Sequence, residues 1–454
     1  MRISVLAQIP SEEPLRRSAM SMRESPKAPP RPIDVTELKY SGPLEIDPFF
    51  PAVPLGGGAG LSEHESMAMA ESDSFAVRAT IEVASAQDIP EKIDGNPIFA
   101  DPRIETFLTC ANSAAVGNHD DVAGLLGTAA LHAAGCDGSK VAIAIVDGGI
   151  NLDHLKQVLG RTPQFDPGNS WTPPRALAPP FAYPVGHGTM CAYDALIAAP
   201  RATLIDVPVL GRFAGGSVMS GSLSAAVQAY SFMLSSWAVA FAAGGLSQYE
   251  SIVLSNSWGM YTEDWDFPEG HKGRYCDNPD HPFDIIVSAL VRFGIDIVFA
   301  AGNCGADCPS SKCDGVTAET IMGANAHGDV LTVAGCDTQN RRVGYSSMGP
   351  SIRNRVQEKP DLTGYTHFMG SQVGGANVPD TGTSAACPVV AGVIAALRSA
   401  RPGSSVPPTN LADILRSTAR KGVGQVTGVP RDDHYGRGII DPVSAAGALG
   451  IIVS

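Results

Sequence analysis

The stretch Asp380-Thr-Gly-Thr-Ser384-Ala-Ala-Cys-Pro-Val-Val-Ala-Gly-Val-Ile-Ala-Ala-Leu397 decides the fold of this chain. It begins as a tight turn with a glycine and continues without a charged residue, which predicts a helix buried on most sides. Pro388 falls in the first turn, where a missing backbone N–H costs little. Ser384 therefore meets free N–H groups and the positive end of the helix dipole, the environment that an acyl-transfer nucleophile needs. The alternative is that Ser384 only caps the helix.

Four apolar segments predict the strands of one sheet, at residues 141–146, 251–254, 295–299 and 330–333. Each segment ends in polar or glycine-rich sequence, and helical segments lie between several of them. This alternation predicts an α/β fold with a mostly parallel central sheet and helices on both faces. Because ligands of such sheets bind at the carboxyl ends of the strands, we expect the chemistry of the protein there.

Four polar side chains stand at strand ends or helix starts. Asp147 and Asn303 follow apolar strands, whereas His187 and Ser384 each open a helix. A histidine can take the proton of a serine hydroxyl, and a carboxylate fixes the tautomer of that histidine. An amide can donate a hydrogen bond to the oxyanion that forms. Each residue alone would have an ordinary structural role, but their order and placement favour a catalytic set.

At these motifs the chain resembles the subtilisin-type serine proteases, the subtilase family (peptidase family S8), from about residue 121 to the end. The motifs that carry the resemblance are 145–150, 186–189, 257–259, 300–303, 359–361, 382–388 and 436–441. The resemblance implies a subtilisin-like three-layer fold and a serine endopeptidase acting on polypeptides. It implies that Asp147, His187 and Ser384 are catalytic and that Asn303 completes the oxyanion hole. The substrate-binding residues it implies are Gly215, Gly216, Ser255, Ser257, Trp258, Gly259, Ala301 and Gly302.

The chain also departs from the family pattern. Gly148 follows the aspartate where the family usually has Ser or Thr, so a hydroxyl that could orient the Asp147 carboxylate is missing. Tyr193 replaces a small residue on the histidine helix. The segment after that helix lacks the Asn-rich calcium loop, so we expect no calcium there. We assign no metal ligand and expect no cofactor, and a calcium site elsewhere in the chain stays open. Insertions at 213–249 and 260–282 are expected near the substrate cleft.

The first hundred residues are interpreted in two parts. Residues 1–74 are rich in Pro, Gly and Ser and predict a weakly ordered leader. Residues 75–108 contain two strand-like segments and stand where the family keeps an inhibitory propeptide, so inhibition by the chain's own N-terminal region is expected. The peptidase domain is placed at 120–454.

The composition and charge of the chain restrict the kinds of molecule that it is expected to bind. The 454 residues carry a net charge of -14, which argues against nucleic acid. Residues 213–249 lack charge, but their serines favour a buried or amphipathic helix over a membrane span. We find no export signal and expect a cytoplasmic protein, or one released by another route, acting as a monomer. The pairing of Cys276, Cys304, Cys308 and Cys313 stays open.

Two other functions compete with the protease. A catalytically silent subtilase fold that binds peptides is favoured only by Gly148 and Tyr193. A serine esterase of the α/β-hydrolase type would need a Gly-x-Ser-x-Gly motif around its nucleophile and the order Ser, Asp, His, and Ser384 has neither.

Overall fold

The computed structural model describes residues 1–24, 31–40, 42–57, 62, 65, 67, 70–109, 113–173, 176, 178–210, 220–238 and 248–453. Gly215 and Gly216, which the sequence assigns to substrate binding, lie outside these residues. So do parts of the 213–249 insertion, whose described part holds α7 (Leu223–Met233) and the π-helical η2 (Leu234–Ala238). None of the helices in the described part of the chain is long and apolar enough to cross a membrane.

The centre of the molecule is a seven-stranded sheet in which every pairing is parallel. Its spatial order is β16 (Leu362–Tyr365), β15 (Leu331–Cys336), β14 (Asp296–Ala300), β12 (Ser251–Asn256), β8 (Val141–Val146), β10 (Thr203–Val207) and β9 (Gln164–Phe165). All residues of β8, β12 and β14 are buried, because parallel strands are covered on both faces.

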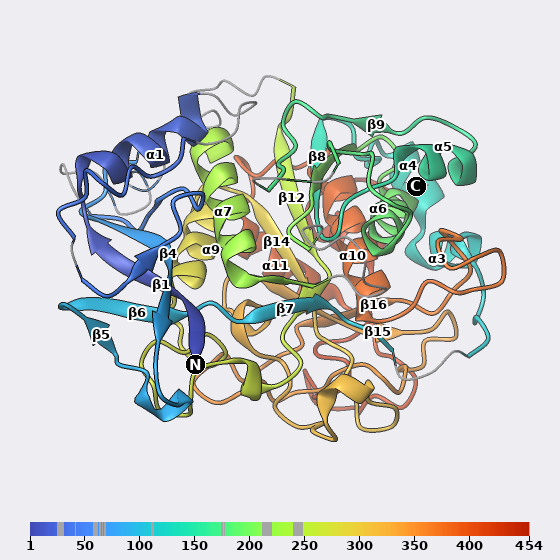
Figure 1. Cartoon of the computed structure of the whole chain (residues 1–454). Helices are drawn as coiled ribbons and strands as arrows, with labels where there is room; N and C mark the ends of the chain where they lie inside the picture. The colour runs from blue at the N-terminus through green and yellow to red at the C-terminus, as the bar shows by residue number, and fades with distance from the viewer. Residues whose placement is uncertain are drawn as a thin grey trace.

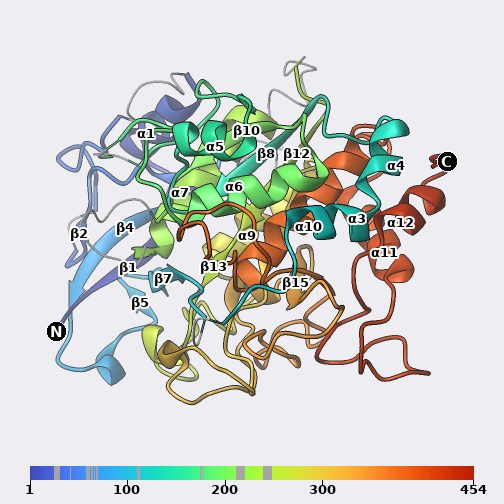
Figure 2. The same cartoon turned by 90° about the vertical axis from the view of Figure 1, so that its right-hand side faces the viewer.

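Helices cover both faces of this sheet (Figures 1 and 2). One face packs on α6 (His187–Ala198) and α10 (Thr383–Arg398), and the other packs on α7 and α9 (Pro282–Arg292). Consecutive residues of β8 divide between the two cores, with Ile143 beneath α10 and Ala144 on the opposite side. The predicted α/β fold with helices on both faces is confirmed. We call the chain from residue 113 onward the main body. Its remaining α-helices, among the residues that the structure describes, are α3 (His119–Leu126), α4 (Thr128–Ala133), α5 (Leu152–Leu159), α11 (Pro408–Thr418) and α12 (Pro442–Ala448).

The N-terminal region forms a second sheet, on the side of α7 and α9 (Figure 1). Strand β1 (Arg2–Pro10) pairs antiparallel with β4 (Ser74–Glu82), and α1 (Glu13–Glu24) follows β1. The interpretation of residues 1–74 as a weakly ordered leader is therefore wrong for these described residues. The reason is that Val5, Leu6, Ala7 and Ile9 are buried against a partner strand more than sixty residues away, a pairing that local periodicity does not reveal. The other strands are β2 (Glu45–Ile46), β3 (Val53–Pro54), β5 (Lys92–Ile93) and β6 (Asn96–Ala100).

A third, three-stranded sheet joins the N-terminal region to the main body. Its middle strand is β7 (Arg103–Thr106), which pairs antiparallel with β11 (Ser220–Ser222) and β13 (Trp258–Gly259). In Figure 1 β7 runs from the N-terminal sheet across the front of the molecule. Residues 103–106 therefore fill the space between two edges of the main body.

Short helical turns complete the described structure, and one disulfide closes a loop there. The turns are η1 (Ala86–Asp88), η3 (Glu263–Trp265), η4 (Ser311–Cys313) and η5 (Gly323–Ala326). Cys304 and Cys313 form a disulfide across a separation of nine residues, whereas Cys276 is a buried free thiol. Cys308 is not a free thiol.

Candidate active site

Asp147 and His187 are in direct contact. Asp147 follows β8 directly, and His187 is the first residue of α6. The Nδ1 atom of His187 lies 2.9 and 3.0 Å from the two carboxylate oxygens of the buried Asp147. This contact fixes the histidine tautomer with its proton on Nδ1 and leaves Nε2 as the basic nitrogen. Within the described residues, His187 Nε2 is buried and has no hydrogen-bond partner.

The backbone replaces the hydroxyl that Gly148 lacks. The N–H of Gly148 donates to Asp147 Oδ1 at 2.7 Å. The thiol of Cys191, one turn into α6, lies 3.8 Å from the other oxygen, Oδ2. The carboxylate is thus held from both ends, so the missing side chain does not leave Asp147 free to rotate.

Ser384 is the second residue of α10 and is completely buried. Its Oγ donates to the carbonyl oxygen of Ser257 at 3.4 Å, and no hydrogen bond joins it to His187 among the described contacts. Cys191 links the two segments, because its Sγ lies 3.5 Å from the Ser384 carbonyl oxygen and 3.7 Å from His187 Nδ1. The structure therefore brings Ser384 beside the Asp147–His187 pair but points its hydroxyl toward Ser257.

Asn303 presents its amide N–H groups to a backbone carbonyl. Its Oδ1 accepts hydrogen bonds from the backbone N–H and the hydroxyl of Thr383, at 2.9 and 3.1 Å. Its Nδ2 donates to the carbonyl oxygen of Phe107 at 3.0 Å. A Cβ at Gly382, whose φ is 83°, would lie 2.8 Å from that nitrogen and 3.4 Å from the Phe107 oxygen. Because Gly382 has no side chain, the space in which Asn303 Nδ2 meets the Phe107 carbonyl oxygen, next to Ser384, stays free.

Phe107 follows β7, and its ring fills a slot in the main body. A Cβ at Gly259 would lie 2.5 Å from the tip of the ring, and one at Gly302 would lie 3.6 Å from it. The ring packs edge-on against Tyr261 with a centroid distance of 5.4 Å. The Tyr261 hydroxyl donates to the Thr106 carbonyl at 3.0 Å and accepts from the N–H of Leu108, so it holds the chain on both sides of Phe107.

The other residues assigned to substrate binding divide into two groups. Trp258 and Gly259 form β13 and pair through their backbones with β7. Ser255 and Ser257 face α10 instead. The Ser255 hydroxyl lies 3.7 Å from the thiol of Cys387, and the Ser257 hydroxyl donates to the Ser384 carbonyl at 2.9 Å. Ala301 is buried, and its N–H donates to the Val333 carbonyl. The structure therefore brings Trp258 and Gly259 to β7. Ser255, Ser257 and Gly302 instead bond to residues of α10, the helix of Ser384, and Ala301 bonds to β15.

Sequence reasoning missed Phe107, Tyr261 and Lys312. Phe107 and Tyr261 meet across 154 positions of sequence, and no motif connects them. Lys312 lies in the Cys-containing loop, where its side chain binds Glu105 of β7. The sequence offered one indication of Phe107 alone: residues 103–108 stand at the end of the propeptide-like segment.

Buried carboxyl groups surround the site. Burial raises the pKa of Asp194 on α6 well above its usual value, and Asp380 raises it further. Burial also raises the pKa of Asp380, although Ser371 donates to it. The ring of Tyr193 packs edge-on against His119, and Gly370 leaves room for it, since a Cβ there would lie 3.3 Å from the Tyr193 ring.

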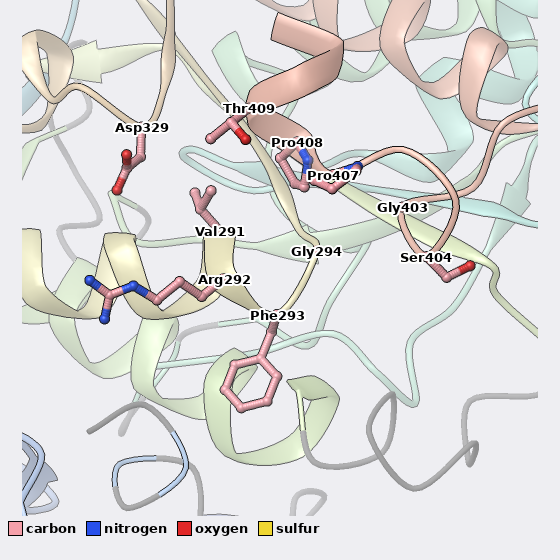
Figure 3. Close-up of a pocket in the computed structure, with 10 residues that line it drawn as sticks. All are labelled: Val291, Arg292, Phe293, Gly294, Asp329, Gly403, Ser404, Pro407, Pro408 and Thr409. Atoms are coloured by element: carbon pink, nitrogen blue, oxygen red, sulfur yellow. The ribbon is translucent and has the colours of Figure 1, made fainter. Parts of the chain in front are cut away.

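One cluster in the described part of the chain offers three metal-ligating side chains, Asp147, His187 and Cys191. The three side chains already form hydrogen-bond contacts with one another. An imidazole and a thiol are also poor ligands for calcium or magnesium. A pocket of about 540 Å3 lies elsewhere, between the end of α9 and the loop before α11 (Figure 3). It adjoins Gly294, before β14, and therefore lies at the amino ends of the strands, away from the predicted site residues.

With this geometry in place, comparison with known proteins identifies the family. The profile of the Subtilase family matches residues 138–438, about two thirds of the chain. The chain belongs to the subtilase family. It is 26% identical over 301 residues to a "Calcium-dependent protease" of Trichormus variabilis (strain ATCC 29413 / PCC 7937) and to one of Nostoc sp. (strain PCC 7120 / SAG 25.82 / UTEX 2576). Each match covers 59% of this chain and 40% of the relative, so this subtilase spans less than half the length of those curated relatives.

Proposed function

We propose that this subtilase is a serine endopeptidase whose N-terminal region occupies its own substrate cleft. The observation that supports the proposal is the Phe107 carbonyl, which accepts a hydrogen bond from Asn303 next to the start of the Ser384 helix. A peptide that enters as an added strand places its reacting carbonyl in this way. Residues 103–106 enter between β11 and β13, as such a strand would.

The chemistry follows from the positions of the four side chains. His187 Nε2 takes the proton of Ser384 Oγ as that oxygen bonds to the carbonyl carbon. The tetrahedral oxyanion is held by Asn303 Nδ2. His187 then gives the proton to the leaving nitrogen, the C–N bond breaks, and water hydrolyses the acyl-enzyme by the same route. The hydroxyl of Ser384 must first leave the Ser257 carbonyl, and catalytic hydrogen bonds that tighten only in the complex are common.

The same contacts support one bond as the one that the enzyme would cut in itself. The residue whose carbonyl meets Asn303 is Phe107, so the bond is Phe107–Leu108. After cleavage, residues 1–107 would stay bound through β7 and inhibit as a product does. The disulfide Cys304–Cys313 favours the second of the two expected locations, release from the cell, because disulfides persist in oxidising surroundings.

A serine-directed fluorophosphonate probe tests the proposal. Full-length protein and its Ser384→Ala variant are incubated, weighed as intact molecules and labelled. We expect labelling of the wild type alone and a new mass that corresponds to residues 108–454. A wild type that neither labels nor changes mass would favour the silent peptide-binding fold. Adding a chelator to the same assay shows whether the calcium dependence in the names of the relatives extends to this chain.

A further inference from the structure

Glu105 occupies the middle of β7 and is a carboxylate without access to solvent. Its backbone pairs with Ser220 and Gly259, and its side chain is completely buried. A buried carboxylate needs a cation, because burial removes the water that would solvate its charge. Lys312 of the main body binds one of its oxygens, and Arg103 of β7 itself binds the other.

The main body holds Lys312 in position for this contact. Lys312 lies in η4, and the loop that contains η4 is closed by the disulfide Cys304–Cys313. The N–H of Ser310 donates to the Asn303 carbonyl at 2.9 Å, which ties the loop to the oxyanion residue. The Lys312 ammonium lies 5.6 Å from the centre of the Tyr261 ring, a distance at which the π face attracts a cation. Lys312 is therefore tied to the same elements that hold Phe107.

The Lys312 ammonium would remain in the cleft when the N-terminal region leaves. Arg103 departs with β7, whereas Lys312 stays in η4 beside the ring of Tyr261. The position it faced, two residues before the reacting carbonyl, is then filled by the substrate. Resting on the proposed function, we propose that Lys312 selects acidic peptides, those with Glu or Asp two residues before the residue whose carbonyl is attacked.

Peptides test this selection directly. Wild-type full chain and its Lys312→Glu and Lys312→Met variants are given Ile-Glu-Thr-Phe, Ile-Gln-Thr-Phe and Ile-Lys-Thr-Phe anilides, with active sites counted by the fluorophosphonate. We expect wild type to favour Glu over Gln at least about tenfold in kcat/KM, as a charge-assisted hydrogen bond allows. Lys312→Met should lose the preference, and Lys312→Glu should favour Lys. The matched control is Lys421→Glu, which changes an exposed lysine bonded to the Val429 carbonyl and should keep the wild-type order.

A charge exchange within the chain provides a second measurement that needs no added substrate. Glu105→Lys and Lys312→Glu should each speed fluorophosphonate labelling of the intact chain, because the cleft opens more often. The double variant should slow it again toward wild type. Equal peptide preference in wild type and Lys312→Glu, or no rescue by the exchange, would overturn the inference while leaving the protease intact. Absence of Ser384-dependent labelling in every variant would overturn the proposed function, and this inference with it.

Discussion

The side-chain nitrogen of Asn303 lies 3.0 Å from the carbonyl oxygen of Phe107. This contact joins the main body to the last residues of the N-terminal region. Thr383, the residue before Ser384, binds the other end of the Asn303 amide, so the orientation of the donor is fixed by the helix that carries the serine. The proposed donor is therefore anchored to the helix of the proposed nucleophile, which is the preorganisation that stabilising a developing oxyanion requires.

The first prediction concerns this donor. Asn303→Ala should lower kcat on a peptide anilide by roughly 10²–10³ and change KM little, since the lost hydrogen bond strengthens only in the transition state. Subtilisin, a member of the same family, loses a factor of about this size when its oxyanion asparagine is removed. Asn278→Ala, an exposed loop amide bonded to the Lys272 carbonyl, is the control. A rate within about threefold of wild type would remove Asn303 from the mechanism.

The sequence predicted those parts of the site that local patterns determine. Asp147 ends an apolar strand and His187 begins a helix, so both could be placed at one edge of the sheet before their contact was seen. The fold class followed from the same alternation. The hydroxyls of Ser255 and Ser257 could not be assigned this way, because alternating side chains point to opposite faces and the motif does not say which face meets α10.

Long-range pairing accounts for most of what the sequence did not predict. Strand β1 gains its partner β4 across more than sixty residues, and without that partner its apolar side chains look too few for a core. Tyr261 reaches Leu108 across 153 positions. Contacts of this kind depend on topology rather than on periodicity, so no window of sequence contains both halves of them.

The second prediction concerns the bond that we propose is cut in self-processing. Phe107→Asp should prevent formation of the 1–107 fragment, because the buried slot beside Gly259 and Tyr261 holds an aromatic ring and would strip a carboxylate of its solvating water. Phe107→Leu should still be cut, since a smaller apolar side chain fits the slot. Intact mass after incubation measures both. Phe165→Asp, at an exposed strand position, is the matched control and should process normally. Unchanged processing of Phe107→Asp would place the cut elsewhere.

The third prediction concerns Asp206 in β10. Burial, and to a smaller extent the Asp147 carboxylate, raise the pKa of Asp206 to about 7, although the N–H groups of Phe181 and Ile150 donate to it. Between pH 4 and 7 the folded state then holds a proton that the unfolded state has lost. This group's contribution to stability therefore falls as pH rises through that window and is constant above it.

Asp206→Asn should remove the loss of stability with rising pH, because the asparagine side chain carries no charge. Its oxygen can still accept hydrogen bonds from both N–H groups. In a Ser384→Ala background, which prevents self-digestion, the difference in Tm between variant and parent should become more positive from pH 5 to pH 8. Asp153→Asn, at an exposed carboxylate, is the control and should show no such trend. A difference that is flat with pH would mean that Asp206 is ionised in the folded protein throughout.

The fourth prediction concerns His281, which joins the main body to β6 of the N-terminal region. Its Nε2 donates to the Ala100 carbonyl at 2.9 Å, and its ring packs edge-on against Phe99 at 5.7 Å. Burial lowers the pKa of His281 to about 4. The Arg355 guanidinium also lowers it, while Asp284 and the Ala100 carbonyl act in the opposite direction. The folded protein therefore holds this ring neutral where the unfolded chain would protonate it.

The contribution of His281 to stability changes with pH in the direction opposite to that of Asp206. The stability that His281 contributes is fully present above about pH 6.5 and is lost as pH falls toward 4, because there the unfolded or separated state binds the extra proton. In the Ser384→Ala background, the Tm of the parent should drop more steeply between pH 6.5 and 4.5 than that of His281→Gln, whose amide can still donate to Ala100. The exposed His434→Gln should follow the parent. The protection of β6 amides against hydrogen exchange, relative to the intrinsic rate at each pH, should fall over the same interval if the acid-sensitive step is separation of the N-terminal region. Parallel Tm curves for the parent and His281→Gln would show that His281 does not couple pH to this contact.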